Sequence, residues 1–147
     1  MIEIQNRKAK FDYEIIDTYE TGIVLTGTEI KSIRQGKANL KDSYCIIKNN
    51  EIYVLNMHIS SYDHGNIFNH EETRTRKLLM HKKEINKIKN NLELNGFTVI
   101  PLKLYFKGSL AKLLIGVAKG KHNYDKRETI KKRDQERELK KYIKKNI

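Results

Sequence analysis

The 147-residue sequence lacks several features on which common classes of protein depend. A single cysteine, Cys45, excludes an internal disulfide and is typical of a reducing compartment. No apolar run approaches the roughly 20 residues that cross a bilayer, and the first ten residues contain no signal-peptide core. These absences predict a cytoplasmic protein without a membrane span.

Motifs for catalysis and for binding metal ions are also missing. The five histidines never recur at the i, i+4 spacing of a helical metal site, and Cys45 has no partner cysteine. The segment GTEIKS, residues 27–32, lacks the length and the ending of a phosphate-binding loop. No nucleophile elbow occurs. We therefore expect no catalytic residue, no metal and no cofactor, with Cys45 buried as a small hydrophobe and the histidines on the surface.

Positive charge is what the sequence has in excess. The net charge is +12, and the segment Lys119–Ile147 carries +7 of it, from twelve basic and five acidic residues. That segment has too few apolar residues to offset the entropy of ordering it, but many good helix formers. It predicts a basic C-terminal tail over 119–147, disordered when free and helical against a polyanion. Residues 1–118 form the predicted folded body.

Three basic clusters in the body point to nucleic acid as the polyanion. Lys and Arg neutralise phosphates, and the aromatic residues Phe11, Tyr44 and Tyr62 lie near enough in sequence to stack on bases. For each cluster alone a solvated face is the alternative, as a solubilising role is for the tail. An anionic membrane is the weaker partner, because the tail has no broad apolar face. The clusters are Arg7/Lys8/Lys10, Lys31/Arg34/Lys37/Lys41 and Arg74/Arg76/Lys77.

Hydrophobic periodicity predicts a body made mainly of short strands. Turns are expected at Thr21-Gly22 and Asn49-Asn50, and Pro101 is expected to restrict strand pairing. The polar stretch 60–76 is expected to form a loop. The predicted strands are 11–19, 23–25, 43–48, 51–59, 97–106 and 110–118.

Two helices complete the prediction. A short one over 29–35 begins at a Thr28 cap and ends at Gly36. A longer one over 78–94 carries an apolar stripe and ends at Asn95-Gly96. This element order predicts a mainly β fold, an OB-type antiparallel Greek-key barrel, with an open α+β sheet as the alternative. The stripe is formed by Leu78, Ile85, Ile88 and Leu92.

Six short stretches give the sequence a family resemblance. Found together in one basic chain of this length, GTEIKSIR and GK-x-x-[HY]-DKR are highly specific. The chain resembles the SsrA-binding protein (SmpB) family, the partners of transfer-messenger RNA in trans-translation. The matching stretches are NRKA (6–9), GIVLTGTEIKSIRQGKA (22–38), TRTRKLLM (73–80), GFTVIPLKLYF (96–106), VAKGK (117–121) and YDKR (124–127).

The resemblance implies a binding protein and not an enzyme. The body would bind the tRNA-like domain of transfer-messenger RNA, which elongation factor Tu with GTP would deliver to the vacant A site of a stalled ribosome. The tail would occupy the empty mRNA channel. The alternatives are a general OB-fold RNA-binding or ribosome-associated factor, a nucleic-acid enzyme and a purely structural protein.

The clusters and the resemblance together predict the contact residues. Glu29 either accepts from base amino groups or orients a basic neighbour, or it satisfies backbone N–H groups at a helix start. Tyr124 replaces a His of some members and can stack but not take up a proton near neutral pH; His122 replaces a basic residue that often follows GK. The predicted RNA-binding residues of the body are Arg7, Lys8, Lys10, Glu29, Lys31, Ser32, Arg34, Lys37, Arg74, Arg76 and Lys77. Those of the ribosome-binding tail are Gly120, Lys121, Tyr124, Asp125, Lys126, Arg127, Lys131, Lys132 and Arg133.

Overall fold

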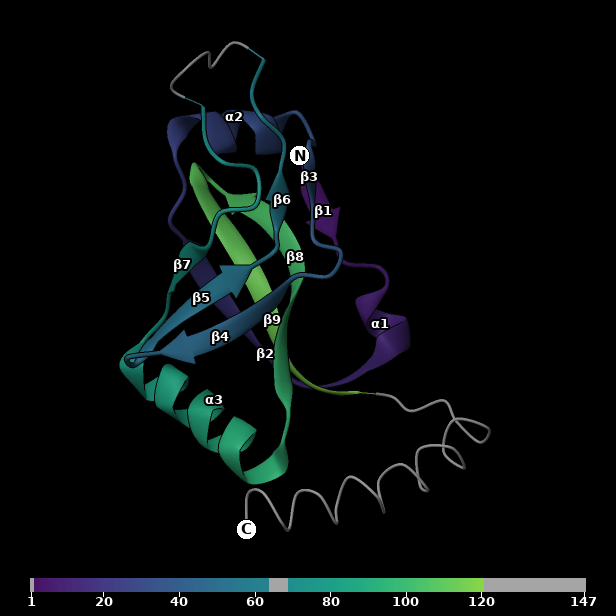
Figure 1. Cartoon of the computed structure of the whole chain (residues 1–147), viewed down its shortest axis with the longest axis vertical. Coiled ribbons are helices and arrows are strands. Elements are labelled where there is room, and N and C mark those ends of the chain that lie inside the picture. Colours follow the sequence, from purple (N-terminus) through teal and green to yellow (C-terminus); the bar gives the residue numbers. More distant parts are fainter. Residues whose placement is uncertain (1, 64–68, 121–147) are drawn as a thin grey trace, which may run out of the picture.

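A computed structural model describes residues 2–63 and 69–120, which form a curved antiparallel sheet with helices at its ends and side (Figure 1). The described helices are α1 (Ala9–Asp12), α2 (Gly27–Arg34) and α3 (Lys82–Asn95). The described strands are β1 (Glu3–Gln5), β2 (Tyr13–Ile23), β3 (Ala38–Asn39), β4 (Tyr44–Lys48), β5 (Glu51–Leu55), β6 (His58–Ile59), β7 (Arg76–Leu79), β8 (Thr98–Lys107) and β9 (Leu110–Gly120).

The main sheet closes on itself. Its strand order is β1-β8-β4-β5-β7-β2-β9, and a further pairing of β8 with β9 joins the two sides. The β4–β8 junction is narrow, with Cys45 opposite Val99. All pairings are antiparallel, and β3 and β6 form a separate two-stranded sheet. Closure confirms the predicted barrel and excludes the open-sheet alternative.

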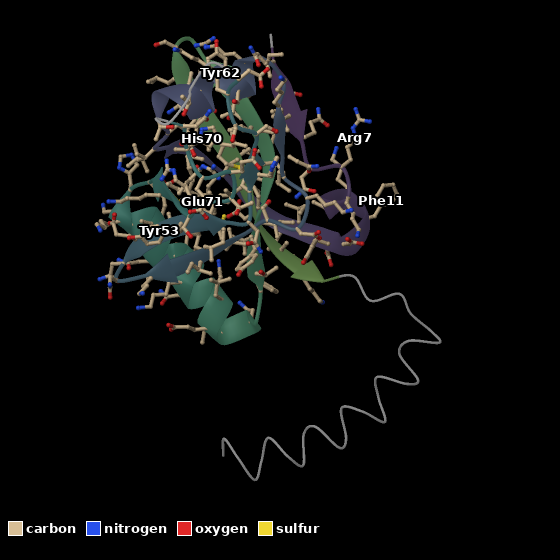
Figure 2. The ribbon with its side chains drawn as sticks, turned by 45° about the horizontal axis from the view of Figure 1, so that its top comes forward. Arg7, Phe11, Tyr53, Tyr62, His70 and Glu71 are labelled. Carbon is tan, nitrogen blue, oxygen red and sulfur yellow. The ribbon has the colours of Figure 1, made fainter. Side chains whose placement is uncertain are left out.

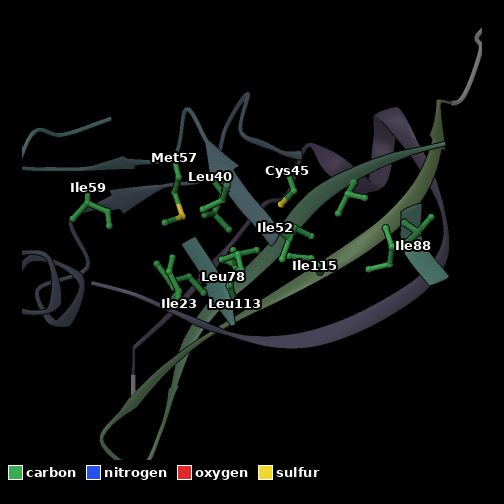
Figure 3. Packing of buried hydrophobic residues seen from close by; sticks show 14 of the residues in the cluster. Ile23, Leu40, Cys45, Ile52, Met57, Ile59, Leu78, Ile88, Leu113 and Ile115 are labelled. Carbon is green, nitrogen blue, oxygen red and sulfur yellow. The ribbon is translucent and has the colours of Figure 1, made fainter. Parts of the chain in front are cut away.

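The barrel interior is a continuous apolar core (Figure 3). Ile52 and Leu113 come from facing strands and are fully buried. Helix α3 buries Ile85 and Ile88 in the same core, and α2, at the opposite end of the barrel in Figure 1, adds Ile33. Cys45 is buried as predicted, and burial raises the pKa of its thiol.

Several local predictions are confirmed by the backbone. Asn49 and Asn50 connect β4 to β5 with φ angles of 52° and 62°, as a tight hairpin of this twist requires. Gly96 ends α3 at φ 66°, where its N–H donates to the Leu92 carbonyl. Pro101 cannot donate to the ladder, and the register of β8 with β9 shifts between Pro101 and Lys103.

The predicted turn at Thr21-Gly22 is wrong, because β2 runs unbroken from Tyr13 to Ile23. Thr21 is buried and donates its hydroxyl to the Leu113 carbonyl at 2.8 Å. Gly22 lies where an added Cβ would be 3.3 Å from the Cβ of Leu79. Glycine therefore permits close approach of a neighbouring strand at this position and does not make a turn.

Other boundaries also differ from the predictions. The strand expected from residue 11 begins instead with α1, which exposes 78% of Phe11. The strand expected over 51–59 is broken at Asn56, whose φ is 61°. The helix expected from Leu78 begins at Lys82, because Leu78 belongs to β7 inside the stretch predicted as loop and helix.

The C-terminal strand also differs from the prediction. Strand β9 continues to Gly120, which pairs with Tyr13, whereas the predicted body ended at Ala118. Lys119, opposite Glu14, likewise belongs to this strand. The remaining predicted tail, residues 121–147, lies outside the described residues.

Candidate nucleic-acid interface

The first turn of α2 is fixed by a capping box. The Thr26 hydroxyl accepts from the Glu29 N–H at 3.3 Å, and the Glu29 carboxylate accepts from the Thr26 N–H at 2.8 Å. The prediction that Thr28 caps this helix is therefore wrong, since the T-x-x-E pattern begins at Thr26. The same box turns the Glu29 carboxylate inward, where its exposure is 0%.

Two arginines of the third basic cluster converge on that carboxylate. Arg74 donates from Nε and Nη2 to the two oxygens of Glu29 at 3.0 and 2.7 Å, and Arg76 donates from Nε at 2.6 Å. Burial alone would raise the pKa of Glu29, but the hydrogen bonds from Arg74, Thr26 and Arg76 hold it below its ordinary value. Glu29 therefore stays ionised at neutral pH.

Arg76 is itself fully buried, yet all its donors have partners. Besides Glu29, its guanidinium donates to the carbonyls of Met57 at 2.6 Å and Arg74 at 3.1 Å, and to those of Glu72 at 3.1 Å and Glu71 at 3.5 Å. Five N–H groups thus meet five acceptors. Burial lowers the pKa of Arg76, and the Glu29 charge opposes that shift. The arginine, which belongs to β7, therefore joins α2 to the residue before β6 and to the end of the long loop that leads into β7.

This arrangement contradicts part of the predicted RNA-facing set. Glu29, Ser32 and Arg76 each have 0% exposure and cannot touch a ligand on the outside of this structure. Glu29 instead has the other two predicted roles: its carboxylate accepts from a backbone N–H at the start of α2, and it orients the basic neighbours Arg74 and Arg76. Ser32 is buried on α2, and its hydroxyl has no hydrogen-bond partner among the described residues.

The side chain of Lys77 is exposed but forms an ion pair with Glu51. Its ammonium lies 2.5 Å from a carboxylate oxygen of Glu51, and Lys82 binds the other oxygen. These two hydrogen bonds lower the pKa of Glu51 to about 2, and the same carboxylate raises the pKa of Lys77. The third basic cluster is therefore largely neutralised by Glu29 and Glu51.

The other two predicted clusters remain on the outside. Within α2 and the segment after it, Lys31 lies 5.4 Å from the ring centroid of Tyr62, and Arg34 lies 4.3 Å from that of Phe106. Lys37 lies 3.5 Å from the Asp63 carboxylate in an exposed pair. We call the exposed cations of both clusters the basic surface, which comprises Arg7, Lys8, Lys10, Lys31, Arg34, Lys37 and Lys41.

The fold brings the two halves of the basic surface together. The Asn6 side-chain amide donates to the Leu40 carbonyl at 3.5 Å and to the Pro101 carbonyl at 2.8 Å. It therefore ties the segment that leads into α1 to the segment that follows α2. Figure 2 shows Arg7 and Phe11 projecting outward on the α1 side, with Tyr62 at the α2 end. Phosphates of one folded RNA can thus meet cations that are 21 or more residues apart in sequence.

Two loop residues that the sequence did not single out also organise this end of the molecule. His70 lies between α2 and β6, with Nδ1 2.8 Å from the Thr28 hydroxyl and Nε2 2.8 Å from the Ile59 carbonyl. Because a carbonyl only accepts, Nε2 carries a proton. Asn69 accepts from the Tyr62 N–H and donates to the Tyr62 carbonyl. No spacing rule identifies these residues, since each acts through a contact made only in the folded chain.

Among residues 2–63 and 69–120, no three His, Cys, Asp or Glu side chains group as metal ligands. Within the same residues, no helix is long and apolar enough to cross a membrane. Of the predicted tail residues, Gly120 is paired in β9. The others lie outside the described ranges, namely Lys121, Tyr124, Asp125, Lys126, Arg127, Lys131, Lys132 and Arg133.

Comparison with known proteins gives consistent matches over nearly the whole chain. The family model of SmpB protein matches residues 3–145. An SsrA-binding protein of Ligilactobacillus salivarius is 59% identical over 140 residues, which cover 95% of this chain and 90% of that one. An SsrA-binding protein of Shouchella clausii is 57% identical over 143 residues, covering 97% and 92%.

A solved structure is similar in fold as well as in sequence. It is described as "tmRNA-SmpB: a journey to the center of the bacterial ribosome" and superposes with a TM-score of 0.71 at 43% identity. The match covers 86% of this chain and 90% of that chain. The similarity therefore extends over the barrel and its helices and is not confined to one motif.

Proposed function

The chain belongs to the SmpB protein family, and we propose on that premise that it binds transfer-messenger RNA and acts with it on the ribosome in trans-translation. The body binds the tRNA-like domain of that RNA and brings it to the A site of a stalled ribosome. There the RNA and protein together allow the ribosome to be rescued and the nascent chain to be tagged.

The observation that carries this proposal is the basic surface. Its seven cations are exposed, and the Asn6–Leu40 contact ties together the two segments that carry them. Cations held on a rigid scaffold bind phosphates by releasing condensed counterions, which gives affinity and positioning without sequence preference. In the remaining cluster Arg76 is turned inward, and its ion pair with Glu29 supports the α2 end of that surface. A folded RNA is the ligand that suits such a surface, because its backbone presents phosphates along two directions.

A binding experiment tests the proposal directly. The full chain should bind the isolated tRNA-like domain of transfer-messenger RNA, and a large excess of bulk tRNA should not displace it. Filter binding at a series of salt concentrations should show log affinity falling linearly with log salt. Equal binding of bulk tRNA would favour a general RNA-binding or ribosome-associated factor instead. Affinity that does not change with salt would exclude phosphate contacts.

The finer parts of the proposal concern the tail and the delivery step. The tail, with its +7 charge, is drawn to ribosomal RNA and occupies the mRNA channel when no message fills it. Elongation factor Tu with GTP acts through the shared RNA, and the protein itself works in the cytoplasm. The protein binds and positions and does not catalyse. Among the body residues, Lys8, Lys31 and Arg34 contact phosphate or ribose.

A further inference from the structure

A cavity of about 320 Å³ opens beside α1, at the junction of the two halves of the basic surface. Its floor is formed by Ala9 and Ile100, each 3% exposed, which pack with Ala118 in a small second core. Its walls come from α1, the start of β2, the turn before β4 and the start of β8. The side chains that give these walls their chemistry are Lys8, Asp12, Tyr13, Asp42, Tyr44 and Thr98.

The cavity is held open by fixed contacts. The Asn6 amide bonds to the carbonyls of Leu40 and Pro101 pin one wall to β8. The Ser43 hydroxyl donates to the Leu40 carbonyl and fixes the turn from which β4 starts. Asp42, in that turn, has a φ of 61°, a left-handed conformation that Asp tolerates better than most residues. A ligand therefore meets a site that is already shaped and does not have to order it.

The lining combines aromatic rings, carboxylates and a cation. Tyr13 and Tyr44 provide flat aromatic surface, and Tyr44 is 39% exposed although it is a large apolar side chain at a strand start. Asp12 and Asp42 provide carboxylate acceptors. Lys8 provides a cation, with Arg7 and Lys10 beside it in sequence. The matching ligand has a flat ring, N–H donors at its edge and an anionic backbone.

We propose that this cavity receives one unstacked nucleobase of the bound RNA, and that the base carries an exocyclic amino group. This inference rests on the proposed function, in that the base belongs to the RNA held by the basic surface. Proteins that read single-stranded RNA stack splayed bases on aromatic side chains and hydrogen-bond their edges. Adenine, cytosine and guanine present amino donors to a carboxylate, and uracil has no amino group. The Lys8 ammonium neutralises an adjoining phosphate.

Other small ligands fit the lining less well. A free phosphate or carboxylate would meet the two carboxylates of Asp12 and Asp42, and like charges repel. A purely aliphatic ligand would leave both carboxylates and Lys8 without partners in the cavity. The volume is at the small end of the range for ligand sites, which suits a single base better than a larger cofactor.

Two measurements on the full chain test the pocket. The first compares affinity for the tRNA-like domain RNA among wild type, Tyr44→Ala, Tyr44→Phe and the control Tyr53→Ala. Tyr53 lies on β5, away from Arg7 and Phe11 in Figure 2. Loss of one stacked base should weaken binding roughly 5- to 150-fold in Tyr44→Ala, the range that corresponds to 1–3 kcal/mol per base. Tyr44→Phe and Tyr53→Ala should stay within about twofold of wild type on the same reasoning.

The second measurement uses short RNAs and does not depend on transfer-messenger RNA. Hexamers of adenylate, cytidylate and uridylate are titrated into wild type and into an Asp12→Asn/Asp42→Asn variant, with Tyr fluorescence as the readout. Wild type should prefer adenylate and cytidylate over uridylate, and the variant should lose that preference. Equal hexamer affinities in wild type, or RNA binding unchanged in Tyr44→Ala, would overturn the pocket. Failure of wild type to bind the tRNA-like domain, with hexamer preference intact, would overturn the proposed function alone.

Discussion

The carboxylate of Glu29 and the guanidinium of Arg76 meet at 2.6 Å inside the protein, and both side chains have 0% exposure. The pair lies between the first turn of α2 and β7, two segments 47 residues apart. Arg76 also donates to the carbonyl of Met57, just before β6, and to that of Glu72, near the end of the long loop. The pair therefore fixes the scaffold on which Lys31 and Arg34 stand, although neither partner can reach a ligand itself.

Removing the charge of Glu29 or Arg76 should destabilise the fold strongly. Breaking one side of a buried ion pair leaves an uncompensated buried charge, which typically costs about 3–5 kcal/mol. We expect Glu29→Gln and Arg76→Met each to lower the free energy of unfolding by that amount, measured by urea denaturation. Lys77→Met is the matched control, since Lys77 neighbours Arg76 but pairs with Glu51 on the surface. A midpoint for Arg76→Met close to that of the control would contradict the structural role.

The same pair predicts how stability depends on pH on the acid side. The pKa of Glu29 is lower in the folded chain than its unfolded value of about 4.3, because Arg74, Thr26 and Arg76 stabilise the charged form. The stabilisation is therefore fully present above that unfolded value and is lost as pH falls through the folded pKa. Other carboxylates contribute to the same decline, so the difference between wild type and Glu29→Gln isolates the part due to Glu29. That difference should shrink as pH drops below about 4; a constant difference would contradict it.

The sequence predicted the barrel correctly where the residues that favour turns and helix ends agreed with the hydrophobic periodicity of the strands and helices beside them. The Asn49-Asn50 hairpin and the Gly96 helix end each follow from backbone conformations that few residues adopt. Strand β7 was missed because its inward positions are Arg76 and Leu78. A charged residue facing the core breaks the alternation by which strands are recognised, and only the distant Glu29 makes that burial possible.

For the same reason, the sequence predicted only part of the nucleic-acid interface correctly. Charge alone cannot tell a cation that faces solvent from one that faces a buried carboxylate. Lys31 and Arg34 are exposed, whereas Arg76, with an equally basic local sequence, is internal. The relevant partner, Glu29, is distant in sequence, so no local pattern could identify it. The hydrogen bond from Asn6 to the Leu40 carbonyl, which links the two segments of the basic surface, likewise exists only in the folded chain.

The division between exposed and engaged cations predicts different effects on RNA binding. Lys31→Gln and Arg34→Gln should each weaken binding to the tRNA-like domain at low salt. Each lost phosphate contact should reduce the slope of log affinity against log salt by about 1. Lys77→Gln should change neither quantity appreciably, because its ammonium already serves Glu51. Arg34→Lys provides a finer control, since it keeps the charge but loses the planar contact with Phe106. A larger effect of Lys77→Gln than of the α2 variants would contradict this prediction, because the RNA would then contact the face that carries Lys77 and not the one that carries α2.

The end of β9 decides where a truncation should be made to test the tail. Gly120 and Lys119 pair with Tyr13 and Glu14 of β2, and Tyr13 also lines the cavity beside α1. A chain that stops at Ala118 would lose this pairing and weaken the body. A chain that stops at Gly120 should keep the body intact and bind the tRNA-like domain with near-wild-type affinity in filter binding.

The Gly120 truncation should nevertheless abolish tagging of a nascent chain in translation of an mRNA without a stop codon. The removed segment carries most of the tail's excess positive charge, and the body's contacts with the RNA do not replace its attraction to the ribosome. The Ala118 truncation, made in parallel, should lose tagging and also some RNA affinity. Because the two chains differ only in the last pair of β9 residues, comparing them separates damage to the body from loss of the tail. Normal tagging by the Gly120 chain would show that the body alone suffices on the ribosome.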